Sequence, residues 1–180
     1  MQITTLASYL VSAMTAWTPP QQHPEGAEVA RQRYESIARD IATVVSDEKE
    51  FPIFAGDHGR TQTALLLAAI ASFESAFRAD VDDGRVRGDS GVSWCVMQVQ
   101  VRGKTAEGWT GKDLVSDRQK CLSAALHLVR ESFTMCKSMP LSYRLSGYTS
   151  GTCRAEREAE YRTGRAVRWF KQHPVATEPS

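Results

Sequence analysis

Glu74 is the residue of this 180-residue chain whose surroundings best suit acid–base chemistry. It lies in the stretch LLLAAIASFESAF (residues 65–77), just after positions 64–71, which carry neither a charged nor a polar side chain. Such a stretch predicts a buried helix that is apolar around its whole circumference. Apolar neighbours and the negative end of the helix dipole both disfavour the anion, so they predict a raised pKa for Glu74 and a role as general acid. The alternative is an ordinary surface charge at a helix terminus.

Four further segments have the apolar periodicity of helices that pack around this central helix. They are residues 1–17, 25–45, 113–131 and 154–170. Thr61 is expected to cap the N-terminus of the buried helix. The stretch that follows Phe77 is rich in Asp and Gly and includes a short extended piece, residues 96–101, which predicts a small β-rich lobe. The expected fold is therefore mainly α, or α+β with a minor sheet, around one buried helix.

Charge and composition exclude several classes of function. The chain has 22 basic and 21 acidic residues, so its net charge of +1 provides no field for nucleic acid. No run of eighteen apolar residues exists, which argues against a membrane span. The acidic stretch at residues 80–84, DVDDG, lacks the ligand spacing of an EF-hand loop and is followed by Arg85 and Arg87. The sequence therefore predicts neither a metal site nor another cofactor.

The cysteines are even in number and never form a CxxC pair, which does not favour a zinc site. Two disulfides are expected if the protein matures in an oxidising compartment, and four reduced, buried thiols are expected otherwise. The residues leave both alternatives, and all three pairings, open. The cysteines are Cys95, Cys121, Cys136 and Cys153.

Four motifs occur in order along the chain: ASFESAF (residues 71–77), GDSGVSWCVMQVQ (88–100), GYTSG (147–151) and EAEY (158–161). Together they resemble the lysozyme-like lytic transglycosylases of the soluble type, over residues 60–170. The resemblance aligns Glu74 and Ser75 with the Glu-Ser pair of that family, and Met97 and Gln98 with its Met-Gln motif. It also aligns Tyr148 with the Tyr-Asn-Ala-Gly element and Tyr161 with the tyrosine of the last helix.

The resemblance implies a lysozyme-like fold and a glycosidase that cleaves peptidoglycan at the β-1,4 bond between N-acetylmuramic acid and N-acetylglucosamine. Glu74 is then the single general acid and base, and the product carries a 1,6-anhydro end. The substrate contacts that the resemblance implies are Ser75, Met97, Gln98, Tyr148 and Tyr161. Glycosidases commonly use a second carboxylate, and Asp89 is the obvious candidate, although a Gly-Asp-Ser-Gly sequence also favours aspartate as a turn residue.

Two alternatives to the transglycosylase remain. The segments IASFES, GDSG and MQV also resemble goose-type lysozymes, which hydrolyse the same bond with help from an aspartate near the position of Asp89. Gln100 occupies the place of a second such aspartate. The transglycosylase resemblance has two departures of its own, since Cys95 replaces a usual glycine of that family and Thr149 replaces a usual asparagine. The other alternative is a non-catalytic domain that binds glycan or has a structural role in a virion or secretion assembly.

The expected organisation is an N-terminal helical segment (residues 1–59) packed on a catalytic domain (60–170) and followed by a tail (171–180). The first basic residue is Arg31, and polar residues interrupt the first apolar stretch, so no signal peptide is recognised. An enzyme that acts on peptidoglycan in the periplasm or cell wall is then expected to arrive with a phage particle or through a secretion machine.

Overall fold

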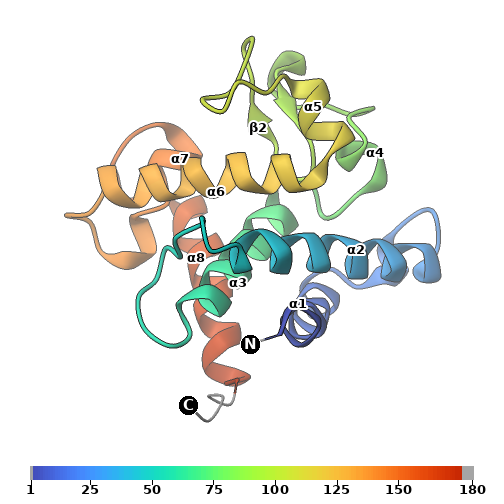
Figure 1. Cartoon of the computed structure of the whole chain (residues 1–180), viewed down its shortest axis with the longest axis horizontal. Helices are drawn as coiled ribbons and strands as arrows, with labels where there is room; N and C mark the ends of the chain where they lie inside the picture. Colours follow the sequence, from blue (N-terminus) through green and yellow to red (C-terminus); the bar gives the residue numbers. More distant parts are fainter. Residues whose placement is uncertain (1, 176–180) are drawn as a thin grey trace.

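The structure is a computed structural model that describes residues 2–175, and most of this part of the chain is helical (Figure 1). The α-helices are α1 (Ile3–Trp17), α2 (Ala27–Ser46), α3 (Gly59–Glu74), α4 (Ala79–Asp82), α5 (Gly111–Ser116), α6 (Arg118–Met135), α7 (Ser146–Ser150) and α8 (Arg157–Gln172). Short 3-10 helices are η1 (Pro20–Gln22), η2 (Asp89–Gly91) and η3 (Leu141–Tyr143), and the strands are β1 (Ser93–Trp94) and β2 (Val99–Gln100). The prediction of a mainly α fold is confirmed.

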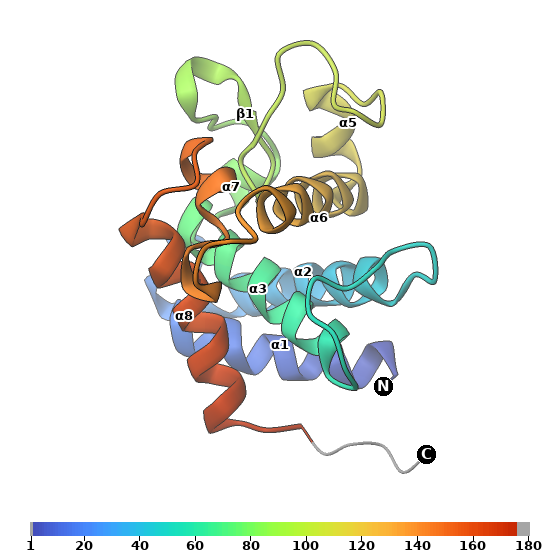
Figure 2. The ribbon, with the colours of Figure 1, turned by 90° about the vertical axis from the view of Figure 1, so that its left-hand side faces the viewer.

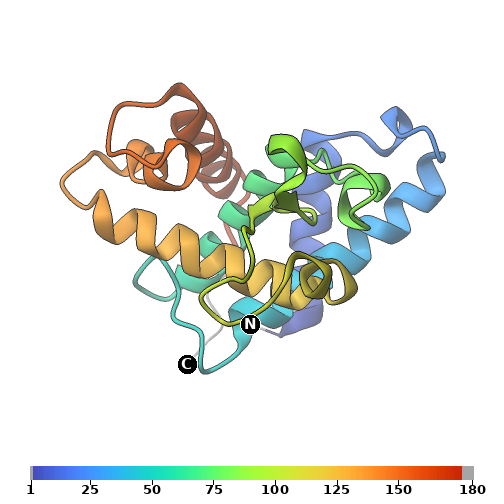
Figure 3. The ribbon, with the colours of Figure 1, turned by 90° about the horizontal axis from the view of Figure 1, so that it is seen from above.

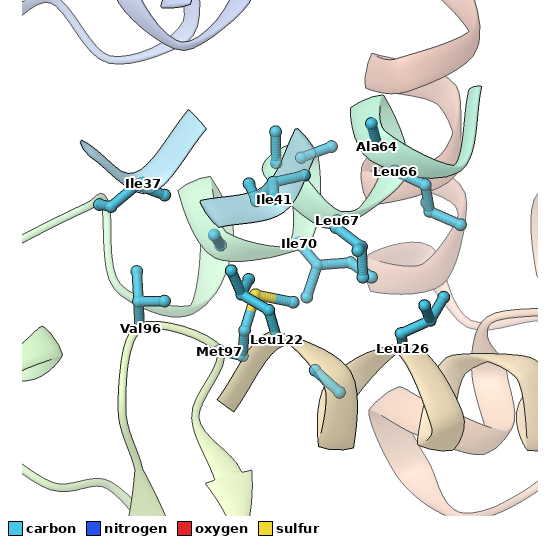
Figure 4. Close-up of a cluster of buried hydrophobic side chains, with 14 of the residues drawn as sticks. Ile37, Ile41, Ala64, Leu66, Leu67, Ile70, Val96, Met97, Leu122 and Leu126 are labelled. Carbon is cyan, nitrogen blue, oxygen red and sulfur yellow. The ribbon is translucent and has the colours of Figure 1, made fainter. Parts of the chain in front are cut away.

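Helix α3 is the buried axis of the molecule. It packs against α1, α2, α6 and α8, which surround it in Figure 2. Every residue from 64 to 71 has an exposed fraction of 0%. Figure 4 shows Leu67 and Ile70 of α3 close to Ile41 of α2 and Leu122 of α6. Because burial of each such side chain contributes about 1.5–3 kcal/mol, the uninterrupted apolar run explains why this helix lies at the centre.

The start of α3 differs from the prediction. Thr61 was expected to be the N-cap, but the cap position is His58, and Thr61 lies inside the first turn. The loop before the helix is fixed instead by Thr63, whose hydroxyl accepts a hydrogen bond from Ile53 N at 2.9 Å and donates one to Gly59 O at 2.8 Å. The contacts of Thr63, two residues later, therefore take the place of the cap expected at Thr61.

The lobe above α6 contains much less β-structure than the sequence suggested. Its sheet consists of two antiparallel strands of two residues each, with Trp94 paired to Val99. The piece expected to be extended, residues 96–101, contributes one strand and a turn between the strands. Cys95 and Gln98 have positive φ values of 59° and 49° in this turn, which is why the extended backbone is interrupted.

The segment 113–131 was expected to form one helix, but it belongs to two. Asp117 separates α5 from α6 with an extended backbone (φ −141°, ψ 99°), and its carboxylate caps α6 by accepting from the backbone N–H groups of Gln119 and Lys120. Helix α5 begins with a capping box between Thr110 and Asp113. Two strong N-caps close together explain the break.

All four cysteines are paired in disulfides, and no free thiol is present among the described residues. Cys95–Cys121 joins the turn after β1 to α6, and Cys136–Cys153 joins the end of α6 to the loop after α7. The alternative of four reduced thiols is therefore wrong for this structure. Paired cysteines are typical of proteins that mature in oxidising compartments.

Helices from both ends of the described chain pack on the central helix α3. Helices α1 and α2 pack on each other and on α3. The division at residue 59 into an N-terminal segment and a catalytic domain stays a prediction. Helix α8 runs to Gln172, two residues beyond the end expected for it, and residues 176–180 of the predicted tail lie outside the described residues. Within residues 2–175, no helix is both long and apolar enough to cross a bilayer.

Candidate active site

A cavity of about 790 Å³ lies between the small lobe and the helices α6, α7 and α8, and Glu74 lines it. Figure 3 shows the lobe on one side and α7 with α8 on the other, with α6 running beneath both. The lobe contributes Gly88, Asp89, Gln98, Val99 and Gln100 to the lining of the cavity. The helices and the residue after α7 contribute Leu128, Glu131, Ser132, Met135, Gly147, Tyr148, Thr149, Ser150, Gly151, Glu158 and Arg162.

Glu74 is the last residue of α3, and its side chain is 21% exposed. Burial raises the pKa of this carboxyl group above its ordinary value, and the negative charges of Glu158 and Asp89 add to the rise. The positive charge and hydrogen bond of Arg162 oppose it, but the net direction is upward. Glu74 therefore combines access to the cavity with a strengthened tendency to hold a proton, which suits a general acid.

Arg162 is a residue of this site that the sequence analysis missed. It comes from α8, has an exposed fraction of 8%, and donates from Nη2 to Glu74 Oε1 at 2.9 Å. Its Nη1 donates to Glu158 Oε2 at 3.2 Å. The spacing of Glu158 and Arg162 along one helix predicts their pairing. Nothing in the sequence connects Arg162 with Glu74.

Asp89 lines the same cavity but is engaged by its own loop. Its Oδ2 accepts hydrogen bonds from Ser93 Oγ at 2.6 Å and from Gln100 Nε2 at 2.9 Å. These two bonds lower the pKa of Asp89, which is therefore held as an anion. Gln100 thus serves as a hydrogen-bond donor to Asp89.

Gln98 also lines the cavity, and both ends of its amide bind the loop. Its Oε1 accepts from Gly88 N at 2.9 Å, and its Nε2 donates to Cys95 O at 3.1 Å. A Cβ atom on Gly88 would lie 2.6 Å from Gln98 Oε1, so a larger residue here would displace the Gln98 amide from this hydrogen bond. Gln98 therefore holds together the two ends of the lobe loop beside Glu74.

Tyr148 joins the helical side of the cavity to the lobe. Its hydroxyl donates to Met97 O at 2.9 Å, and its backbone N–H donates to Ser132 Oγ at 2.9 Å. Burial raises the pKa of Tyr148, and the negative charge of Glu74 raises it further, which keeps the phenol neutral. Its single O–H is used in the bond to Met97 O, so in this arrangement the phenol oxygen can only accept a further hydrogen bond.

Three of the seven predicted site residues do not line the cavity. Ser75 is 5% exposed, and its hydroxyl donates to Ala71 O and accepts from Phe77 N, so it caps the end of α3. The side chain of Met97 is part of the core (Figure 4). Tyr161 lies on α8 with an exposed fraction of 50%. The structure thus brings Glu74, Asp89, Gln98 and Tyr148 together and leaves the other three outside the lining.

The two departures from the family motifs also have definite places. Cys95 is 1% exposed, forms a disulfide with Cys121, and does not line the cavity. Its φ of 59° belongs to the left-handed region that favours glycine. Thr149 does line the cavity, and its hydroxyl donates to Ser146 O at 3.3 Å.

Unfavourable backbone conformations gather around the cavity. All non-glycine residues with positive φ in the described part of the chain lie between positions 76 and 98. Two of them, Ala76 and Phe77, lie two and three residues after Glu74, and two others, Asp89 and Gln98, line the cavity. Such conformations cost on the order of 1–3 kcal/mol each and are concentrated at functional sites. Their placement supports this cavity as the functional site of the protein.

Metal chemistry has no evident site here. Residues 2–175 contain no cluster of three His, Cys, Asp or Glu side chains arranged to hold a metal ion. The aspartates that follow Phe77 form ion pairs with arginines instead: Asp80 with Arg78, Asp82 with Arg118, and Asp83 with Arg85.

Comparison of the chain with protein-family models, with curated proteins and with solved structures gives no match.

Proposed function

We propose that this protein is a peptidoglycan-cleaving glycosidase with a lysozyme-like fold, and that it acts as a lytic transglycosylase. The observation that carries the proposal is the position of Glu74, a carboxyl group with a raised pKa at the end of a buried helix and at the wall of a cavity. Three of the four motifs that resemble the family supply Glu74, Gln98 and Tyr148 to this one cavity. Their positions at one cavity support the resemblance in addition to the amino-acid sequences of the motifs.

The proposed reaction uses Glu74 twice. Glu74 first transfers its proton to the glycosidic oxygen, and the bond between that oxygen and C1 of N-acetylmuramic acid breaks, with the electron pair leaving on the oxygen. The N-acetyl group of the same sugar stabilises the positive charge at C1. The Glu74 carboxylate then accepts the proton of the 6-hydroxyl while O6 bonds to C1. The product is a 1,6-anhydro sugar, and Glu74 is again protonated.

Hydrolysis is the second candidate function, because Asp89 lines the same cavity. In a goose-type lysozyme, an aspartate near this position assists the attack of water. Here Asp89 Oδ2 already accepts two hydrogen bonds from Ser93 and Gln100. A carboxylate held in this way favours a structural role in the turn, so we place the transglycosylase first.

The proposed site of action is the periplasm or the cell wall. The two disulfides support it, since such bonds persist in oxidising compartments. Delivery by a phage particle or a secretion assembly belongs to the same proposal, as does a role for residues 1–59 in docking to that assembly.

Mass spectrometry of the soluble fragments released from purified peptidoglycan tests the proposal. The wild-type protein and Glu74→Gln are compared under identical conditions. We expect fragments that end in 1,6-anhydro-N-acetylmuramic acid from the wild type and none from the variant. Arg85→Gln, at a surface ion pair away from the cavity, serves as a matched control and should release the same fragments as the wild type.

Other products would identify the alternatives. Reducing-end sugars that disappear in Glu74→Gln would mean that water is the acceptor, and the protein would be a hydrolase. No glycan product from a correctly folded wild-type protein would contradict both enzymatic functions. It would favour a non-catalytic domain that binds glycan or has a structural role in an assembly.

A further inference from the structure

We propose that Arg162 is the positioning residue for Glu74: it holds Oε1 of the carboxyl group and thereby makes Oε2 the oxygen that carries and delivers the proton. This inference rests on the proposed role of Glu74 as the acid and base of the reaction. It adds a residue from α8 that none of the four sequence motifs assigns to the reaction.

The contact between the two side chains is well defined. Arg162 Nη2 lies 2.9 Å from Glu74 Oε1, and the guanidinium is largely withdrawn from solvent. Glu158 holds the other terminal nitrogen, Nη1, at 3.2 Å, and the guanidinium carbon lies 5.5 Å from the centre of the Phe73 ring. A guanidinium fixed at several points is a rigid fork, and it loses little freedom when it orients a carboxyl group.

The chemistry of the pair assigns the proton to one oxygen. A guanidinium has only donors, so the oxygen that faces it must present a lone pair. A neutral carboxyl group has one O–H, and its carbonyl oxygen is the stronger acceptor. With Oε1 facing the Arg162 donor, the proton is therefore favoured on Oε2. Among the described residues, the hydrogen bond that Glu74 receives from another side chain goes to Oε1, which leaves Oε2 available to a glycan in the cavity.

The charge of Arg162 suits a residue that must act first as an acid and then as a base. Burial, Glu158 and Asp89 favour the protonated form of Glu74, whereas Arg162 favours the carboxylate that remains after proton transfer. The charge of Glu74 helps to raise the pKa of Tyr148 of α7, so this phenol stays neutral and adds no charge to the site. Arg162 is therefore the group that stabilises the anion between the two proton transfers and keeps the return of the proton possible.

Two variants of Arg162 and one control test this role. Arg162→Met removes both the charge and the fork, and Arg162→Lys keeps the charge but removes the fork. Arg165→Met is the control, because Arg165 lies one turn further along α8, stacks on Phe73, and donates to Ser72 Oγ without lining the cavity. The readouts are kcat and KM against pH on soluble glycan strands, and a ¹³C NMR titration of the Glu74 carboxyl group.

We expect Arg162→Met to lower kcat about 100-fold with KM changed less than threefold, because a misplaced acid affects the reacting state more than binding. The alkaline limb of its pH profile should move to higher pH, since loss of a nearby cation raises the pKa of Glu74. Arg162→Lys should keep that limb near the wild-type position and still lose at least tenfold in kcat. Arg165→Met should match the wild type in both respects.

The titration separates this inference from the proposed function. If the wild-type protein cleaves no glycan, the proposed function fails, but an upward shift of the Glu74 titration in Arg162→Met would still establish the contact. An unshifted titration, or an Arg162→Met enzyme within twofold of wild-type kcat, would overturn the inference. If Arg162→Met does not fold, Glu158→Gln replaces it. Loss of the Glu158 charge should move the Glu74 titration to lower pH, and no movement would count against the arrangement.

Discussion

The hydroxyl group of Tyr148 donates a hydrogen bond to the backbone carbonyl of Met97 at 2.9 Å, across 51 positions of sequence. Two of the motifs that suggested a transglycosylase, the Met-Gln pair and the GYTSG element, therefore meet in space. Met97 contributes its carbonyl oxygen to this contact while its side chain packs in the core. Met97 therefore takes part in this contact through its backbone, whereas Tyr148 takes part through its side chain.

Tyr148→Phe should destabilise the fold modestly. The substitution removes the hydrogen bond to Met97 O and keeps the ring, so we expect a loss of about 1–2 kcal/mol in the free energy of unfolding. Urea denaturation followed by circular dichroism measures it. Tyr161→Phe is the control, because Tyr161 is half exposed and should change the free energy of unfolding by less than about 0.5 kcal/mol. Equal effects of the two substitutions would contradict the contact.

Asp89→Asn distinguishes a turn residue from a catalytic one. In the proposed transglycosylase the carboxylate of Asp89 is a hydrogen-bond acceptor within its loop, and asparagine keeps one acceptor oxygen. We expect kcat on soluble glycan strands to fall less than about fivefold. A carboxylate that assists water would cost about 100-fold or more when replaced. A loss of that size would transfer the preference to the hydrolase.

The unfolding free energy should depend on pH through Glu74. Because the folded-state pKa of Glu74 is raised above 4.5, the folded protein holds this proton more tightly than the unfolded chain does. Its stabilising contribution is complete below pH 4.5 and is lost as pH rises through the folded-state pKa. Chemical denaturation of the wild type and Glu74→Gln over a pH series should show a decline that the variant lacks. Parallel curves would contradict the shift.

Arg118 should be important for the attachment of the lobe. It donates to Asp82 of α4 with Nε and Nη2, and to Asp40 and Ser36 of α2 with Nη1. Arg118→Gln leaves two partly buried carboxylates without their cation, so we expect a loss of about 2 kcal/mol in the free energy of unfolding. In Arg85→Gln the broken ion pair is exposed and screened by solvent, so a much smaller loss is expected. Similar losses in thermal denaturation would contradict this ranking.

Removal of one disulfide should destabilise the protein by a predictable amount. Cys136 and Cys153 are 17 residues apart, and closing a loop of this length in the unfolded chain corresponds to about 3 kcal/mol. The double variant Cys136→Ser with Cys153→Ser should therefore have a lower midpoint of thermal unfolding. The wild type in a strong reductant should approach the same midpoint or fall below it. A double variant as stable as the oxidised wild type would show that the bond does not constrain the unfolded chain.

Local patterns in the sequence predicted the elements whose burial dominates their energy. The apolar run before Glu74 predicted both the helix and its central place, because every side chain in it avoids water. The boundary between α5 and α6 was missed, since two competing caps, Thr110 and Asp117, decide it. The extended piece before Val101 was overestimated because positive φ values at Cys95 and Gln98 turn the chain there.

The residues of the candidate site show the same difference between local patterns, which predict structure, and long-range contacts, which the sequence does not reveal. Glu74 was identified from its local context, and the expected rise in its pKa has its main cause in that context, burial by apolar neighbours. Arg162 was missed because its contact with Glu74 joins positions 88 residues apart. The polar walls of the cavity on α6 were missed for the same reason, since Glu131 and Ser132 look like ordinary helix residues until α7 and the lobe are placed beside them.

Both disulfides have one sulfur on or next to α6, and their partners lie on opposite banks of the cavity, at Cys95 in the lobe and at Cys153 beyond α7. The two disulfides thus tether the lobe and the segment after α7 to the same helix, α6, which limits how far the two sides of the cavity can move apart. A hinge motion that closes the two sides over a substrate, as in enzymes with lids, is restrained by these two disulfides. For the proposed reaction, glycan strands would therefore bind to and leave a cavity whose two sides move little relative to each other.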